Sequence, residues 1–212
     1  MDFIDTRREG MQPRVPSEPY AKIWSGGKTG LLEFVWEYDN QTAGGMLVPQ
    51  KEDVQLEVWL ENRRAVDVPV TLQFCPVLKG TVFEDRALTR TWLHTADGWK
   101  RMADTDRGAG KFSLCHYSIE GEPKISPPLP WGAGKEISDN GLAAVVSEDG
   151  KYVFAMTWGT PRSILSNADI PCIHADPKVK FAKAGQKAVY KGKVYLIKGS
   201  LEDLLKRVQE AN

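Results

Sequence analysis

The segment PCIHADP, residues 171–177, places three side chains with reactive groups at alternate positions. Cys172, His174 and Asp176 are two residues apart, and on an extended chain this spacing turns all three to one face. A thiol, an imidazole and a carboxylate are ligands that transition metals use, and they are also groups that transfer protons. The segment therefore fits a metal site, an acid–base site, or a packed loop without chemistry.

The sequence contains only three histidines, and each one is on or beside a predicted strand. They are His94 in WLHTADGW, His116 in SLCHYS and His174 in PCIHADP. If the three converge on one face of a sheet, their imidazoles could bind a divalent transition metal and leave its fourth coordination position open. Zinc is the first expectation, and copper and iron are the alternatives. Asp176 would then be a ligand, a catalytic carboxylate, or the partner that fixes a histidine tautomer. The alternative is three separate histidines, because no dense ligand motif such as HExxH is present.

Aromatic and basic side chains near the histidines predict a carbohydrate site, because tryptophan stacks on sugar rings and arginine holds carboxylates. The expected substrate-binding residues are Trp92, Trp99, Trp131, Arg90 and Arg101. For a lyase, the expected proton acceptor is a tyrosine such as Tyr117, or a lysine. The alternatives are that the tryptophans pack the core and that the arginines pair with nearby acids.

Paired carboxylates on one strand face offer a different enzyme. Glu57 and Glu61 share a face with Trp59, which is how some β-sheet glycosidases present an acid and a nucleophile. Alternating glutamates are also usual on the solvated face of an antiparallel sheet.

Composition excludes several partners. The 28 basic and 28 acidic residues balance, which argues against nucleic acid and gives no reason to expect a membrane surface. No apolar run is long enough to span a bilayer. The first ten residues contain no apolar stretch, so no signal peptide is expected in this sequence, and a trimmed one would mean export. Three cysteines cannot form a full disulfide framework, and one bridge with a free thiol is the alternative.

Alternation of apolar and polar residues predicts an all-β fold. Residues 53–62 and 68–78 alternate along their length and are joined by a short connection, so they predict an antiparallel hairpin. Further strands are expected at residues 31–39, 89–95, 111–120, 141–147, 151–158 and 186–199. NQTAGG, residues 40–45, predicts a break, Gly192 predicts a bend, and about twenty residues after 120 predict a Pro/Gly-rich loop that gates the site.

The resulting prediction is one antiparallel β-sandwich, similar to a jelly roll, with a short C-terminal amphipathic helix. The expected organisation is an arm at 1–29, a sandwich at 30–199, and a helix at 200–212 that packs on the same domain. Ser200 is expected to cap this helix, because apolar residues after it recur at helical spacing.

Three stretches together carry a resemblance: VQLEVWLENRRAVDVPVTLQFCPVL, then TWLHTADGW, then PCIHADP followed by GKVYLIKGSLEDLLKR. They resemble a group of uncharacterised bacterial β-sandwich proteins that occur beside carbohydrate-degrading enzymes. The resemblance implies a carbohydrate-related role and no catalytic residue. Together with the histidines it predicts a metal-dependent, carbohydrate-active lyase or hydrolase. The alternatives are a non-catalytic carbohydrate-binding module and a structural protein with its tryptophans in the core.

Overall fold

β-Strands make up most of the chain in the computed structural model, which describes residues 4–5, 25–26, 30–38, 40–108, 113–125 and 131–210. The strands are β1 (Ile4–Asp5), β2 (Ser25–Gly26), β3 (Leu32–Tyr38), β4 (Gln41–Pro49), β5 (Asp53–Asn62), β6 (Val68–Leu72), β7 (Thr91–Thr95), β8 (Gly98–Arg101), β9 (Leu114–Ile119), β10 (Gly132–Ser138), β11 (Ala143–Val146), β12 (Tyr152–Trp158), β13 (Pro161–Asn167), β14 (Cys172–Pro177), β15 (Lys180–Ala182) and β16 (Lys187–Lys198). A 3₁₀ turn spans Met102–Asp104, and the helix α1 spans Leu201–Glu210.

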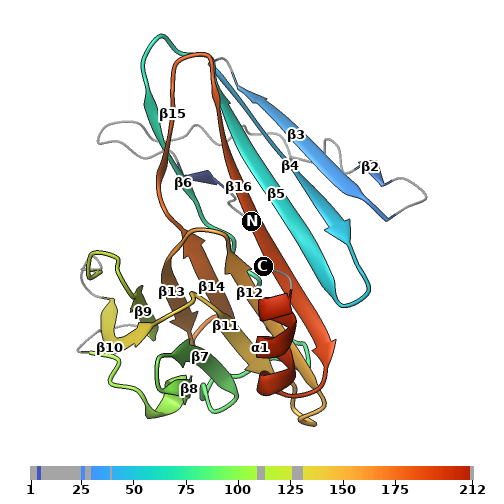
Figure 1. The fold of residues 1–212 in the computed structure, drawn as a ribbon, viewed down its shortest axis with the longest axis vertical. Helices are drawn as coiled ribbons and strands as arrows, with labels where there is room; N and C mark the ends of the chain where they lie inside the picture. The colour runs from blue at the N-terminus through green and yellow to red at the C-terminus, as the bar shows by residue number, and fades with distance from the viewer. Residues whose placement is uncertain are drawn as a thin grey trace.

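The strands form a sandwich of two layers (Figure 1). One layer is a nine-stranded sheet in the order β2-β3-β4-β5-β16-β12-β11-β7-β8. The other layer consists of a four-stranded sheet, β10-β9-β13-β14, and a three-stranded sheet, β1-β6-β15. β14 packs over β12 and β11, while β15 packs over β16 and β5. All pairings are antiparallel except the parallel pair of β9 and β10, so the predicted all-β sandwich is confirmed among the described residues.

The main core lies between the two layers. It includes Tyr117, Ile164 and Ile173 from the four-stranded sheet and Leu93 and Met156 from the nine-stranded sheet, all buried. Because side chains alternate along a strand, the neighbours of Tyr117, Ile164 and Ile173 project from the other face of their sheet. That second face, turned away from the core, is called the outer face below.

The predicted hairpin of residues 53–62 and 68–78 is wrong. β5 pairs with β4 and β16, whereas β6 pairs with β1 and β15 in the opposite layer. Residues 63–67 therefore cross between layers instead of closing a hairpin. The alternation itself was informative: Val70 and Leu72 on β6 and Leu60 on β5 are buried in the same core, which they enter from opposite sides.

The break predicted at residues 40–45 is wrong. Residues 41–45 lie inside β4, and strand pairing also continues through Gly192 on β16 without a register shift. Both positions approach an indole closely, because a Cβ on Gly44 would lie 2.5 Å from Trp59 and one on Gly192 would lie 2.6 Å from Trp158. Glycine here makes room for tryptophan instead of marking a turn.

The long loop predicted after residue 120 is partly a strand. β10 begins at Gly132, inside that loop, and β13 was not predicted at all. Residues 126–130 of the predicted gate lie outside the described residues, as does most of the predicted arm at 1–29.

The C-terminal helix is confirmed. The backbone N–H of Asp203 donates to Ser200 Oγ at 3.2 Å, and the N–H of Ser200 donates to Asp203 Oδ2 at 2.8 Å, which caps the first turn. Leu204 packs with Ala155 and Tyr195 on the face of the nine-stranded sheet opposite the core. No helix in the described part of the chain has the length and apolarity that a membrane span requires.

Candidate metal centre

β14 carries the PCIHADP segment at one edge of the four-stranded sheet, as its extended spacing predicted. Ile173 and Ala175 enter the core, so Cys172, His174 and Asp176 project together from the outer face. Cys172 and His174 are nonetheless buried. The strand thus delivers a thiol and an imidazole into a site that is shielded from solvent.

Cys75 reaches this site from a distant part of the sequence. Val77 forms an antiparallel bridge with Cys172, and the N–H of Leu78 donates to the carbonyl of Pro171 at 2.8 Å. Continuing that register by two residues places Cys75 opposite His174. Sequence reasoning missed Cys75, because only the long-range bridge identifies its neighbour.

Cys75, Cys172 and His174 form a cluster of metal-ligating groups, called the Cys₂His cluster below. Their ligand atoms all lie within 4.8 Å of one another. Within the described ranges, this is the one group of three or more such residues that could hold a metal ion. The predicted grouping of three histidines does not form there.

The two nitrogens of His174 face different partners. Nε2 is 3.6 Å from Cys172 Sγ, and Nδ1 is 3.6 Å from Asp176 Oδ1. The second distance is an ion-pair contact and is too long for a hydrogen bond. Among the described residues, the buried atoms Nδ1 of His174 and Oδ1 of Asp176 have no hydrogen-bond partner. Ser163 Oγ donates to the other carboxylate oxygen of Asp176 at 3.4 Å.

Electrostatic coupling polarises the cluster. The Cys172 thiol donates to Cys75 and lowers the pKa of Cys75, assisted by His174 and opposed by burial. The same hydrogen bond, together with burial, raises the pKa of Cys172. Burial alone would lower the pKa of His174, but Asp176 and Cys75 outweigh it and raise this pKa to about 9. The cluster therefore favours a thiolate at Cys75 beside an imidazolium at His174.

The geometry fits a tetrahedral metal ion. With Zn–S of about 2.3 Å and Zn–N of about 2.0–2.1 Å, a tetrahedral angle puts sulfur and nitrogen ligands about 3.6 Å apart. The Cys172 Sγ to His174 Nε2 distance has this value. An ion held by Nε2 would leave Nδ1 facing Asp176, and a carboxylate in this place orients a histidine ligand. Three protein ligands leave a fourth position open.

His116 lies on the same outer face, two strands from His174. Both histidines are registered opposite Leu165 of β13, so the three side chains form one row. The ring of His116 stacks on Trp131 with centroids 5.6 Å apart, and its Nε2 is buried without a hydrogen-bond partner in the described part of the chain. Burial chiefly lowers the pKa of His116, while the charge of Asp176 opposes this.

His94 belongs to a separate site. It lies on β7 in the nine-stranded sheet, where its Nδ1 is 2.8 Å from Asp139 Oδ1 and its ring meets the edge of Trp99. The structure therefore brings His116 and His174 to one face and leaves His94 with its own carboxylate.

The other predicted site residues also lie away from the Cys₂His cluster. Tyr117 is buried in the core on the inner face, its hydroxyl is 2.7 Å from that of Thr105, and burial chiefly raises its pKa. Trp92 lies opposite Arg101 on β7 and β8. Arg101 pairs with Asp104 at 2.7 Å.

Arg90 is also occupied. Its guanidinium donates to the backbone carbonyls of Val82, Glu84 and Val146. Of the predicted substrate-binding residues, Trp131 directly precedes β10 and stacks on His116 of the four-stranded sheet.

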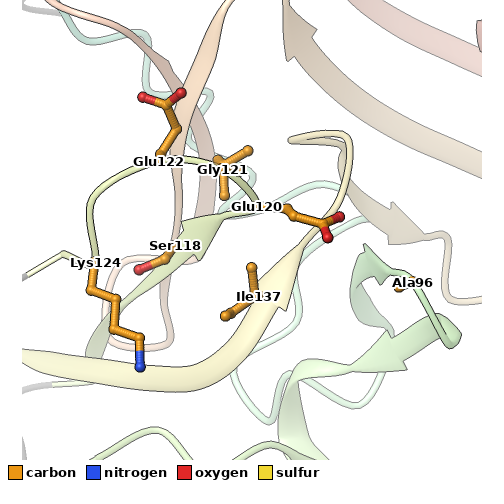
Figure 2. A pocket seen from close by; sticks show the side chains of 8 residues that line it. Ala96, Ser118, Glu120, Gly121, Glu122, Lys124 and Ile137 are labelled. Carbon is orange, nitrogen blue, oxygen red and sulfur yellow. The ribbon is translucent and has the colours of Figure 1, made fainter.

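A shallow hollow of about 220 Å³ opens at the ends of β9 and β10 (Figure 2). Its lining includes Ser118, Glu120, Lys124 and Ile137. Ser118 is registered opposite Ser163, which is registered opposite Asp176, so the hollow and Asp176 lie at opposite ends of one row across the sheet. The hollow thus borders the outer face that carries the metal-ligating cluster.

No family model and no curated protein matches the sequence. Among solved structures, a protein from Synechocystis sp. PCC 6803 matches 83% of this chain with a TM-score of 0.47 at 9% identity. A candidate aldose 1-epimerase from Klebsiella pneumoniae matches 86% with a TM-score of 0.45 at 13% identity. The α-galactosidase AgaB from Geobacillus stearothermophilus matches 81% with a TM-score of 0.46 at 8% identity. These matches span 64%, 53% and 24% of the respective chains.

Proposed function

We propose that this protein is a metal-dependent, carbohydrate-active enzyme whose divalent metal, zinc in the first instance, is bound by Cys75, Cys172 and His174. The observation that carries the metal site is the meeting of these three ligand atoms within 4.8 Å. Asp176 supports the site through His174, while Cys75 and Cys172 take the ligand positions that the sequence-based prediction gave to His94 and His116.

Two thiolates and one imidazole suit zinc, because soft sulfur ligands favour it over magnesium or calcium. Zinc with three protein ligands keeps a position for water or substrate, and it lowers the pKa of bound water towards neutrality. This chemistry would serve a hydrolase by supplying a nucleophile, or a lyase by neutralising a carboxylate of an acidic sugar.

The carbohydrate part of the proposal has its own support. Trp131 lies partly exposed beside His116, directly before β10, and an exposed indole is a stacking surface for a sugar ring. The hollow that borders this face offers Glu120 and Lys124 to sugar hydroxyl or carboxylate groups. The resemblance of the sequence to proteins found near carbohydrate-degrading enzymes points to the same class of substrate.

Metal analysis of the full chain tests the metal site. We expect about one equivalent of zinc per chain, and we expect His174→Ala to lose it. His94→Ala is the matched control and is expected to keep the metal, because His94 lies in the nine-stranded sheet and pairs with Asp139. If circular dichroism shows that both variants are folded and both contain the same amount of zinc as the parent chain, the metal is bound elsewhere.

A second experiment tests the substrate class. Zinc-loaded protein is screened against neutral and acidic polysaccharides for cleavage, and for binding through tryptophan fluorescence. Trp131→Ala is expected to weaken binding, whereas Trp99→Ala, on the other sheet, is expected to leave it unchanged. If the zinc-loaded chain neither binds nor cleaves any polysaccharide in the screen, the carbohydrate part of the proposal is wrong, while the metal site still stands.

A further inference from the structure

Two of the three free cysteines lie close together in the Cys₂His cluster. The sulfur atoms of Cys75 and Cys172 are within 4.8 Å of each other, and neither is in a disulfide. A disulfide requires an S–S distance of about 2.05 Å. The two sulfurs therefore need to approach by less than about 3 Å. Because Cys75 lies opposite His174, diagonally across from Cys172, closure requires movement of the backbone as well as rotation of the side chains.

Regular strand pairing does not hold the backbone at Cys75. Residues 73–76 belong to no strand or helix and connect the end of β6 to the bridge at Val77. Cys172, in contrast, is the first residue of β14, which β13 holds in register. Closure would therefore move Cys75 towards a fixed partner.

Access to solvent distinguishes the two sulfurs. Cys75 is half-buried, whereas Cys172 is only 5% exposed. A small-molecule disulfide can therefore reach Cys75 first, and Cys172 is positioned to resolve the product from within the protein.

The third cysteine is separated from this pair. Cys115 is buried on the inner face of the sheet, where its thiol donates to the carbonyl of Arg107 at 3.4 Å. Cys75 and Cys172 lie on the outer side of the four-stranded sheet, so the sheet separates them from Cys115. Only one intramolecular pairing of the three cysteines is open to the folded chain.

We infer that the Cys₂His cluster has a second state, a reversible Cys75–Cys172 disulfide formed by thiol–disulfide exchange, which releases the bound metal. The disulfide rests on the cysteine geometry alone, and metal release rests in addition on the proposed function. A disulfide removes both thiolate ligands and leaves His174 alone, which cannot hold zinc tightly.

The exchange balances with a small-molecule disulfide as the oxidant. The sulfur of Cys75 attacks one sulfur of the oxidant, so that a mixed disulfide forms and one small thiolate leaves. The sulfur of Cys172 then attacks Cys75 Sγ, and the second small thiolate leaves. The two cysteine sulfurs give up two electrons, which reduce the oxidant to two thiols. Protons come from solvent or from the Cys172 thiol, and zinc leaves as Zn²⁺ without change of charge.

Oxidised glutathione added to the zinc-loaded full chain tests this inference. We expect free thiols to fall from three to one and a mass decrease of about 2 Da per chain. Peptide mapping is expected to join the peptides of Cys75 and Cys172, and a colorimetric chelator is expected to detect about one equivalent of released zinc. Dithiothreitol and added zinc should restore the starting state.

Two variants make the result specific. Cys115→Ser is the matched control, and it should lose both remaining thiols and its zinc at the rate of the parent chain. Cys75→Ser should form no intramolecular disulfide. Glutathione that stays on Cys75 without a protein disulfide, or a linkage that includes Cys115 in folded protein, would overturn the inference. A Cys75–Cys172 disulfide in a chain that binds no zinc would support the exchange and contradict the metal site, so the two failures are distinguishable.

Discussion

The two faces of the four-stranded sheet use alternate residues of the same strands for different purposes. On β14, Ile173 and Ala175 are buried in the core between the layers. Cys172, His174 and Asp176, which alternate with them, carry polar and reactive groups, and atoms of two of these side chains have no hydrogen-bond partner within the described ranges. The side chains on the inner face are apolar and pack in the core, whereas the outer face has buried polar atoms that a ligand could hydrogen-bond or coordinate. One six-residue strand thus contributes both to the core and to the candidate metal centre.

Truncation on the inner face should have the largest effect on stability. Ile173→Ala is expected to lower the free energy of unfolding by about 2–5 kcal/mol, because a fully buried isoleucine leaves a cavity. Ile170→Ala, at a position that is 55% exposed, is the matched control and should change it by less than about 0.5 kcal/mol. Urea denaturation measures both. Equal losses in the two variants would contradict the assignment of β14's inner face to the core.

Overfilling the inner face should be the next largest effect. A Cβ on Gly134 would lie 2.4 Å from the ring of Tyr117, so Gly134→Ala forces the buried ring to move and is expected to cost about 1–3 kcal/mol. At Gly159 the nearest atom to such a Cβ is 3.6 Å away, and Gly159→Ala should be close to neutral in the same denaturation experiment. Zinc affinity should stay unchanged in both, and a loss of zinc with Gly134→Ala would show that the faces are coupled.

On the outer face, a change at Asp176 should affect metal affinity more than stability. Asp176→Asn removes the negative charge beside Nδ1 of His174 and is expected to weaken zinc binding by roughly 10–100-fold. Competition with a chromophoric chelator measures this affinity. Asp139→Asn makes the same change beside His94 and should leave zinc affinity as it is. If zinc affinity falls by a similar factor in both variants, the Asp176–His174 pair has no special role in metal binding.

The smallest expected effect concerns the hydroxyl of Thr105, which is hydrogen-bonded to the Tyr117 hydroxyl and donates to the carbonyl of Met102. Thr105→Val keeps the shape of the side chain but removes this hydroxyl, which should cost about 1 kcal/mol. Thr105→Ser, which keeps a hydroxyl, should recover most of the loss. If the thermal unfolding midpoints of the two variants coincide, the Thr105 hydroxyl contributes nothing measurable to stability.

Local pattern in the sequence identified much of the fold. Alternation located β3, β5, β7, β9, β11, β12 and β16, and helical spacing after Ser200 located α1. It failed where a residue has a role that local pattern does not express. The local pattern predicts a break at Gly44, which instead accommodates Trp59, and a hairpin of β5 and β6, whose connection instead crosses between layers.

For the candidate site, the sequence alone determined that Cys172, His174 and Asp176 share one face, because the twofold alternation of an extended strand follows from its backbone geometry. It did not determine which side chains meet them. The tertiary structure brought in Cys75 through the bridge between Val77 and Cys172, aligned His116 with His174 across Leu165, and sent His94 to Asp139. Strand pairing between residues about one hundred positions apart depends on the packing of the whole chain, and no short segment encodes it.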